Sequence, residues 1–165
     1  MKKLAGLMVL LVAVALSAAP RKDEIKGMGF GKIKSLVGDW EGRDKNGNLI
    51  RSSYKLVSNG TAVQEKLNPT NNEDMITIYY RDGDRLMLTH YCSEGNQPRM
   101  RAATEAGGNS LDFSFVDITN LQDPATGHMR HLVVSFQDDD HFTQKWTWRE
   151  KGRERVDIFH FTRKR

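Results

Sequence analysis

The feature that most constrains this chain is a succession of ten short β-type segments separated by turn residues. The turns contain pairs such as Asn59-Gly60 and Asp82-Gly83, which accept the positive φ angles of tight hairpins at low cost. No long helical pattern occurs after residue 37. The segments are predicted at residues 38–43, 49–57, 61–67, 74–80, 85–92, 98–104, 110–120, 128–137, 141–149 and 154–163.

Ten consecutive strands with short turns predict an all-β, antiparallel up-and-down meander. A meander of this length exposes two edges unless it closes on itself. We therefore expect residues 36–165 to form a closed β-barrel, with a two-sheet sandwich as the alternative. Residues 20–35 are expected to form a flexible arm through Gly31, followed by a short helix that begins near Lys32.

Residues 1–19 have the pattern of a secretory signal peptide. Lys2 and Lys3 precede an apolar run from Leu4 to Leu16, and the small residues 17–19 follow. The run is shorter than the roughly 20 residues of a permanent membrane helix, although an uncleaved anchor is the alternative. We expect a periplasmic or secreted protein, with the exact cleavage site left open.

Charge and cysteine content exclude several classes of protein. The net charge of +4 falls to +2 without residues 1–19, with 23 basic against 21 acidic side chains. A near-neutral chain lacks the clustered basic surface of a nucleic-acid-binding protein. The single cysteine, Cys92, excludes an internal disulfide, a thiolate-rich zinc site and a lipid-anchored N-terminal cysteine.

The predicted interior of the barrel mixes apolar and polar side chains, because alternate residues of a strand share a face. Several buried polar groups in one small barrel favour an internal cavity over a dry core. A packed core with local hydrogen bonds is the alternative. The candidate ligand-binding residues are Tyr54, Glu65, His90, Cys92, Met100, Phe113, Phe115, Gln144, Trp146 and Trp148.

A polar loop cluster follows His90 and Cys92. It consists of Asn96, Gln97 and Arg99, at the end of a predicted hairpin. Functional residues concentrate on loops held by a rigid scaffold, so this cluster is expected to lie at the mouth of the cavity. The alternative is that its amides bind loop backbone and that His90 and Cys92 are ordinary core residues.

The segment Gly38-Asp39-Trp40 resembles the Gly-x-Trp signature that opens the first strand of the calycin superfamily. The wider sequence resembles bacterial secreted proteins with a lipocalin-like domain of unknown function. The resemblance implies a barrel, secretion and a Trp40 that packs across the closed end; it implies no established activity. The matching segments are residues 38–42, 60–62, 84–92, 96–100 and 141–148.

Three other kinds of chemistry have only partial support in the sequence, and no cofactor is predicted. His90, Cys92 and Glu65 would supply only part of a zinc site. A Cys92 nucleophile would have His90 about 7 Å away along the strand, which is long for proton transfer. Haem would need an inward histidine, for which His160 is the positional candidate by similarity to nitrobindin-like barrels.

The predicted function is therefore the binding of a small, partly apolar molecule by an exported barrel. We expect no nucleic-acid partner and no permanent membrane anchor. An enzyme that uses Glu65 and His90 as acid and base is one alternative. A structural or interaction module with a filled barrel is another. The sequence does not determine the oligomeric state.

Overall fold

The computed structural model describes residues 22–68, 74–103 and 108–165. The predicted signal peptide, residues 1–19, lies outside these residues. The elements are α1 (Lys22–Ser35), β1 (Gly38–Arg43), β2 (Leu49–Val57), η1 (Ser58–Gly60), β3 (Ala62–Asn68), β4 (Met75–Asp82), β5 (Arg85–Tyr91), β6 (Gln97–Ala102), β7 (Ser110–Thr119), β8 (His128–Phe136), β9 (His141–Glu150) and β10 (Arg153–Arg163).

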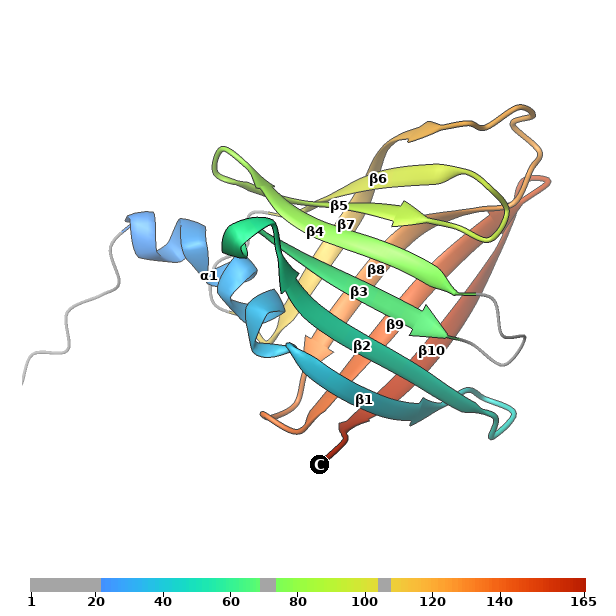
Figure 1. The fold of residues 1–165 in the computed structure, drawn as a ribbon. Helices are drawn as coiled ribbons and strands as arrows, with labels where there is room; N and C mark the ends of the chain where they lie inside the picture. The colour runs from blue at the N-terminus through green and yellow to red at the C-terminus, as the bar shows by residue number, and fades with distance from the viewer. Residues whose placement is uncertain (1–21, 69–73, 104–107) are drawn as a thin grey trace, which may run out of the picture.

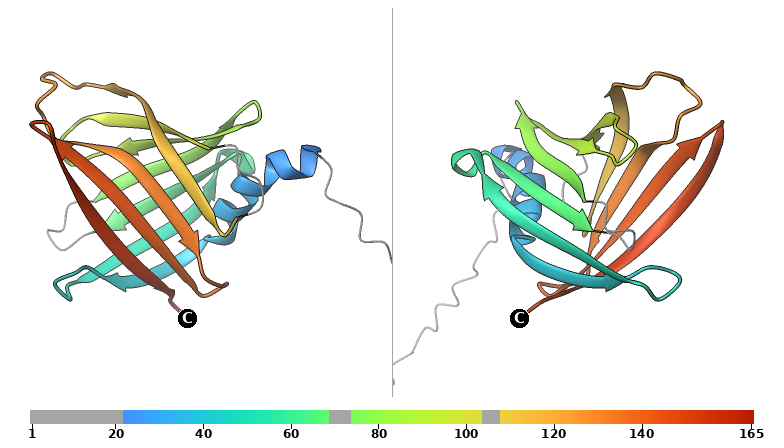
Figure 2. Two further views of the ribbon diagram at one scale, coloured as in Figure 1. Left: turned by 180° about the vertical axis from the view of Figure 1, so that it is seen from behind. Right: turned by 45° about the vertical axis from the view of Figure 1, so that its right-hand side comes forward.

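The ten strands form a closed antiparallel barrel in which each strand pairs with its neighbours in sequence, and β1 pairs with β10 (Figures 1 and 2). The prediction of an up-and-down barrel is confirmed, and the sandwich alternative is wrong. The predicted strand ranges differ from the observed ones by at most two residues at either end. The turns follow the expected chemistry: Lys151 and Gly152 join β9 to β10 with φ angles of 48° and 74°.

Helix α1 closes one end of the barrel (Figure 1). Phe30, Ile33 and Leu36 are buried in the same core as the inward side chains of the strands. The helix begins ten residues before the expected start at Lys32, so residues 22–31 are helical rather than an extended arm. No helix in the described ranges is long and apolar enough to cross a membrane.

Trp40 joins this helix to the barrel wall. Its indole Nε1 donates to the carbonyl oxygen of Leu36 at 2.7 Å, and its ring meets Phe142 edge-on with the ring centres 4.7 Å apart. The guanidinium of Arg163, on β10, lies 4.1 Å from the centre of the Trp40 ring. The same guanidinium donates to the carbonyl oxygens of Ser35 and Val37. The helix end, the first strand and the last strand are therefore linked at one point.

The opposite end of the barrel is called the mouth below. It contains the start of β2, the end of β5 and the loop that precedes β8. Gly127, in that loop, lies against Trp148, because a Cβ added to Gly127 would be 1.9 Å from the Cζ2 atom of the indole. Glycine is therefore required at this position for the loop to lie on the ring.

We predict that Trp40→Phe lowers the free energy of unfolding by about 2 kcal/mol, because it removes a buried hydrogen bond and part of the packing against Phe142. Chemical denaturation of the purified protein measures this value. Trp148→Phe, at a half-buried residue of the mouth, serves as the matched control and should lower the free energy of unfolding by less. Equal costs for the two variants would contradict the role of Trp40.

Candidate functional site

A belt of hydrogen-bonded polar side chains crosses the interior of the barrel, with the fully buried Glu65 at its centre. Its carboxylate Oε1 accepts from the hydroxyls of Ser52 at 3.1 Å and Tyr54 at 2.9 Å. Gln144 Nε2 donates to the same oxygen at 2.7 Å. The hydroxyl of Tyr79 donates to Oε2 at 2.8 Å. Both carboxylate oxygens are thus occupied by protein donors.

The strand register explains why these residues meet. Tyr54 on β2 lies directly opposite Glu65 on β3, and Glu65 lies opposite Thr77 on β4. Thr77 in turn lies opposite His90 on β5. Residues directly opposite each other in a sheet project to the same face, so all four point inward. Gln144 reaches them from β9, on the other side of the lumen, and so connects the two walls.

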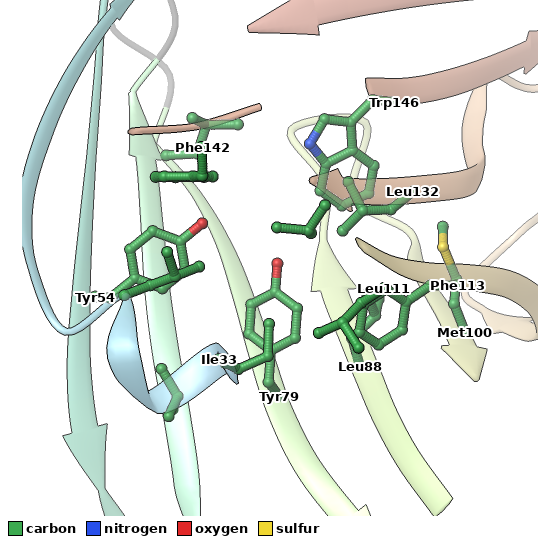
Figure 3. Close-up of a cluster of buried hydrophobic side chains, with 14 of the residues drawn as sticks. Ile33, Tyr54, Tyr79, Leu88, Met100, Leu111, Phe113, Leu132, Phe142 and Trp146 are labelled. Carbon is green, nitrogen blue, oxygen red and sulfur yellow. The ribbon is translucent and has the colours of Figure 1, made fainter. Parts of the chain in front are cut away.

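Burial controls the protonation of this belt. It raises the pKa of Glu65, against the opposing effect of its four donors. Burial, together with the nearby Glu65 carboxylate, raises the pKa of Tyr54 and of Tyr79 well above the ordinary value for tyrosine. Both phenols therefore stay protonated and remain donors. Figure 3 shows their hydroxyls turned toward the same interior region as the indole of Trp146.

His90 is the one member of this region with an unused polar atom. Its Nδ1 lies 2.9 Å from Thr77 Oγ1, and its ring centre lies 4.8 Å from that of Trp146. The side chain is fully buried, and Nε2 has no partner among the described residues. Burial lowers the pKa of His90 to about 4, so the imidazole is neutral at pH 7. Trp146 is held in turn, because its Nε1 donates to Gln144 Oε1 at 3.1 Å.

The predicted loop cluster divides between the interior and the surface. Asn96 is buried and donates to the carbonyl oxygen of Gly127 at 2.9 Å, while its Oδ1 has no partner in the described part of the chain. Gln97 bonds within the loop and to Thr119. Arg99 is exposed and pairs with Asp117 on the outer face. Arg99 therefore does not line the lumen.

The remaining candidates differ in depth. Met100, Phe113 and Trp146 are fully buried in the core, whereas Phe115 and Trp148 are half-buried. Cys92 is buried near the mouth, and burial raises the pKa of its thiol, which is therefore protonated at neutral pH.

The structure gives no support to the alternatives based on metal, thiolate or haem. His160 is exposed and bonds to Thr143 on the outer face, while Phe159 and Phe161 point inward. It cannot ligate a haem inside the barrel. The described residues contain no group of three His, Cys, Asp or Glu side chains placed to hold a metal ion. A protonated Cys92 thiol is a poor nucleophile.

Three residues of this region were not among the predicted site residues: Ser52 on β2, and the pair Thr77 and Tyr79 on β4. Both residues of the pair lie on a predicted strand, and because they are two residues apart, alternation places them on the same face of it. The missing information was which face of that strand points inward, because Ile76 and Ile78 on the other face are more apolar than Thr77 and Tyr79.

The comparisons with known proteins support the fold alone. No protein-family model matches the chain, and no curated protein matches it. The chain is similar in structure to Rv2717c from M. tuberculosis, with a TM-score of 0.55 and 13% sequence identity. The match covers 82% of this chain and 97% of that one. The barrel is thus shown, while membership of the calycin superfamily stays a prediction.

We predict that Glu65→Ala lowers the free energy of unfolding by about 3 kcal/mol, since it leaves four buried donors without their acceptor and opens a cavity. Glu65→Gln should cost less, because its amide oxygen can still accept and Tyr79 can rotate its hydroxyl to accept from the amide nitrogen. Chemical denaturation measures both values. Glu41→Ala, at an exposed carboxylate, is the control, and a Glu65→Ala protein as stable as this control would contradict the role of the belt.

We also predict that burial of neutral His90 makes the fold sensitive to acid. The unfolded state takes up a proton near pH 6.5, whereas the folded state does so only near pH 4. Stability from this group is therefore complete above pH 6.5 and is lost as the pH falls toward 4. The full loss is about 3 kcal/mol. Denaturation curves for wild type and His90→Gln should diverge through this window, with His160→Gln following wild type; parallel curves would contradict the prediction.

Proposed function

We propose that this barrel binds a small, partly apolar molecule in its lumen, on the mouth side of the polar belt. The observation that carries the proposal is the unpartnered Nε2 of the fully buried His90. A buried polar atom without a partner costs about 1–3 kcal/mol, and native proteins rarely leave one unpaired. A ligand that hydrogen-bonds to Nε2 removes this cost.

The belt and the closed end indicate where such a ligand would lie. Tyr54, Tyr79 and Phe113 pack together in the half of the barrel nearer α1, with Tyr79 and Phe113 ring centres 5.8 Å apart. Gln144 bridges the lumen to Tyr54 and Glu65. We therefore propose that the ligand lies on the mouth side, next to the unpartnered His90 nitrogen and Trp146. Such a site combines apolar walls with a few oriented polar groups.

The ligand class follows from the same chemistry. His90 is neutral at pH 7, so it offers one hydrogen bond and no charge. Trp146 and the half-buried Trp148 offer flat apolar surface. We propose an uncharged or weakly polar molecule with one hydrogen-bonding group at its buried end. The signal-peptide pattern of residues 1–19 supports an exported, calycin-like carrier rather than an intracellular one.

The enzyme alternative has less support. Oε1 of Glu65 already accepts three hydrogen bonds from protein groups and Oε2 accepts one, so protein donors use most of the acceptor positions of this carboxylate. A general base must come within hydrogen-bond reach of the proton it removes. His90 remains available, but a single neutral imidazole without a second reacting group is better suited to binding.

We expect native mass spectrometry of the protein purified from its own host to show a bound small molecule. In His90→Phe, which keeps a ring against Trp146 but removes the nitrogen atoms, the affinity should fall about tenfold through the loss of one buried hydrogen bond, and the fraction of protein with bound ligand should fall with it. His131→Phe, at a half-buried imidazole that pairs with Asp112 on the outer face, should keep the ligand.

A ligand-free mass for a folded wild-type protein would overturn the proposal. A bound ligand retained equally by His90→Phe would overturn the role of His90. Conversion of the released molecule on incubation with fresh protein would overturn simple binding in favour of the enzyme.

A further inference from the structure

Strand β10 extends beyond the strand that closes the barrel. β1 pairs with β10 only through residues 40–43, which lie opposite residues 160–163. β9, in contrast, pairs with β10 from Arg153 to Thr162. Among the described residues, the stretch 153–159 of β10 thus has a neighbouring strand on one side only, and we call this stretch the free edge.

Along the free edge, the even-numbered residues point their backbone N–H and C=O groups away from β9, toward the side that has no neighbouring strand. Lys164 donates its backbone N–H to Asp39 on the β1 side. Backbone direction alternates along a strand, so Glu154, Val156 and Ile158 face the same way. The two-residue turn between β9 and β10 leads to the same assignment. It places Arg153 in a hydrogen-bonded pair with Glu150, so the odd-numbered residues point their backbone groups toward β9.

Most side chains along this edge are exposed. The loop after β1 lies beside residues 157–159 of the free edge, and Asp44, Lys45 and Asn46 line a surface pocket together with them. The side chains of Val156 and Ile158 point outward and are 42% and 43% exposed. An accessible strand edge with unpaired N–H and C=O groups is a template for another strand.

We propose that the free edge pairs with the same edge of a second copy of this chain, antiparallel, about a two-fold axis at Val156. In this register Val156 of the two copies forms a hydrogen-bonded pair, and Glu154 pairs with Ile158 of the second copy on each side. Three such pairs use the outward-facing backbone groups of both strands. A two-fold axis requires this kind of self-complementary patch.

The charges along the edge select this register. With the axis at Val156, Arg155 lies opposite Asp157 of the second copy, and the pair occurs twice. An axis at Arg155, Asp157 or Glu154 would place like charges directly opposite each other, which is destabilising. An axis at Ile158 would require residue 160, which already pairs with β1. Within one chain Arg155 and Asp157 already lie 3.0 Å apart, so both are in place at this edge.

Single-cysteine cross-linking tests the register directly, with Cys92→Ala as the background. In Val156→Cys the two Cα atoms would lie about 5.5 Å apart across the axis, which is within the range of a disulfide. In Ile158→Cys, at an equally exposed neighbouring position, they would lie about 13 Å apart. We expect disulfide dimers at least about tenfold faster for Val156→Cys. Equal rates would overturn the proposed register.

Sedimentation of the uncross-linked protein provides the second test. Wild type should show a dimer. Its dissociation constant should rise about tenfold or more in Asp157→Arg, because this change places two arginines opposite each other across the axis. The double variant Arg155→Asp/Asp157→Arg should restore it. Val156→Pro removes an edge N–H without touching the β9 pairing and should give a monomer. A monomeric wild type, or a dimer that neither Asp157→Arg nor Val156→Pro weakens, would overturn the proposal.

Discussion

The buried carboxylate of Glu65 is the group on which the interior of this barrel depends. A buried carboxyl group is unfavourable unless hydrogen-bond partners replace its hydration. Here Ser52, Tyr54, Tyr79 and Gln144 do so, and they come from β2, β4 and β9. One buried acid thus fixes the positions of strands on opposite walls, and it requires that every one of its partners be polar and inward-facing.

The belt lies between two parts of the barrel interior. On the α1 side, the tyrosine rings, Phe113 and Phe142 fill the space, and Trp40 and Arg163 attach the helix to the wall. On the mouth side, His90 is oriented by Thr77 and Trp146 but keeps one nitrogen unused. In the proposed function, the packed half would support the half that recognises the ligand, as expected of a site built on rigid strands.

The sequence carried most of the fold and less of the site. Turn pairs such as Asn59-Gly60 and the alternation within each strand were sufficient for the strand ranges, because both are local signals. Helix α1 was missed over residues 22–31 because three glycines lower its intrinsic helix propensity. Its buried residues Phe30 and Ile33 show that packing onto the barrel overrides that propensity.

The central contact of the site could not be read from the sequence. Glu65 and Gln144 are 79 residues apart and meet only because the sheet closes. Alternation placed each of them inward but gave no information on which strands face each other across the lumen. The same limit explains His160, whose direction depended on whether Phe159 and Phe161 or Val156 and Ile158 form the inner face of β10.

NMR titration of the His90 imidazole nitrogens tests the central claim most directly, on protein as isolated from its host and after the bound molecule has been stripped. The account predicts a neutral ring down to about pH 4 and an Nε2 signal that differs between the two samples while Nδ1, held by Thr77, stays constant. A midpoint near pH 6.5, or identical Nε2 signals in both samples, would contradict it.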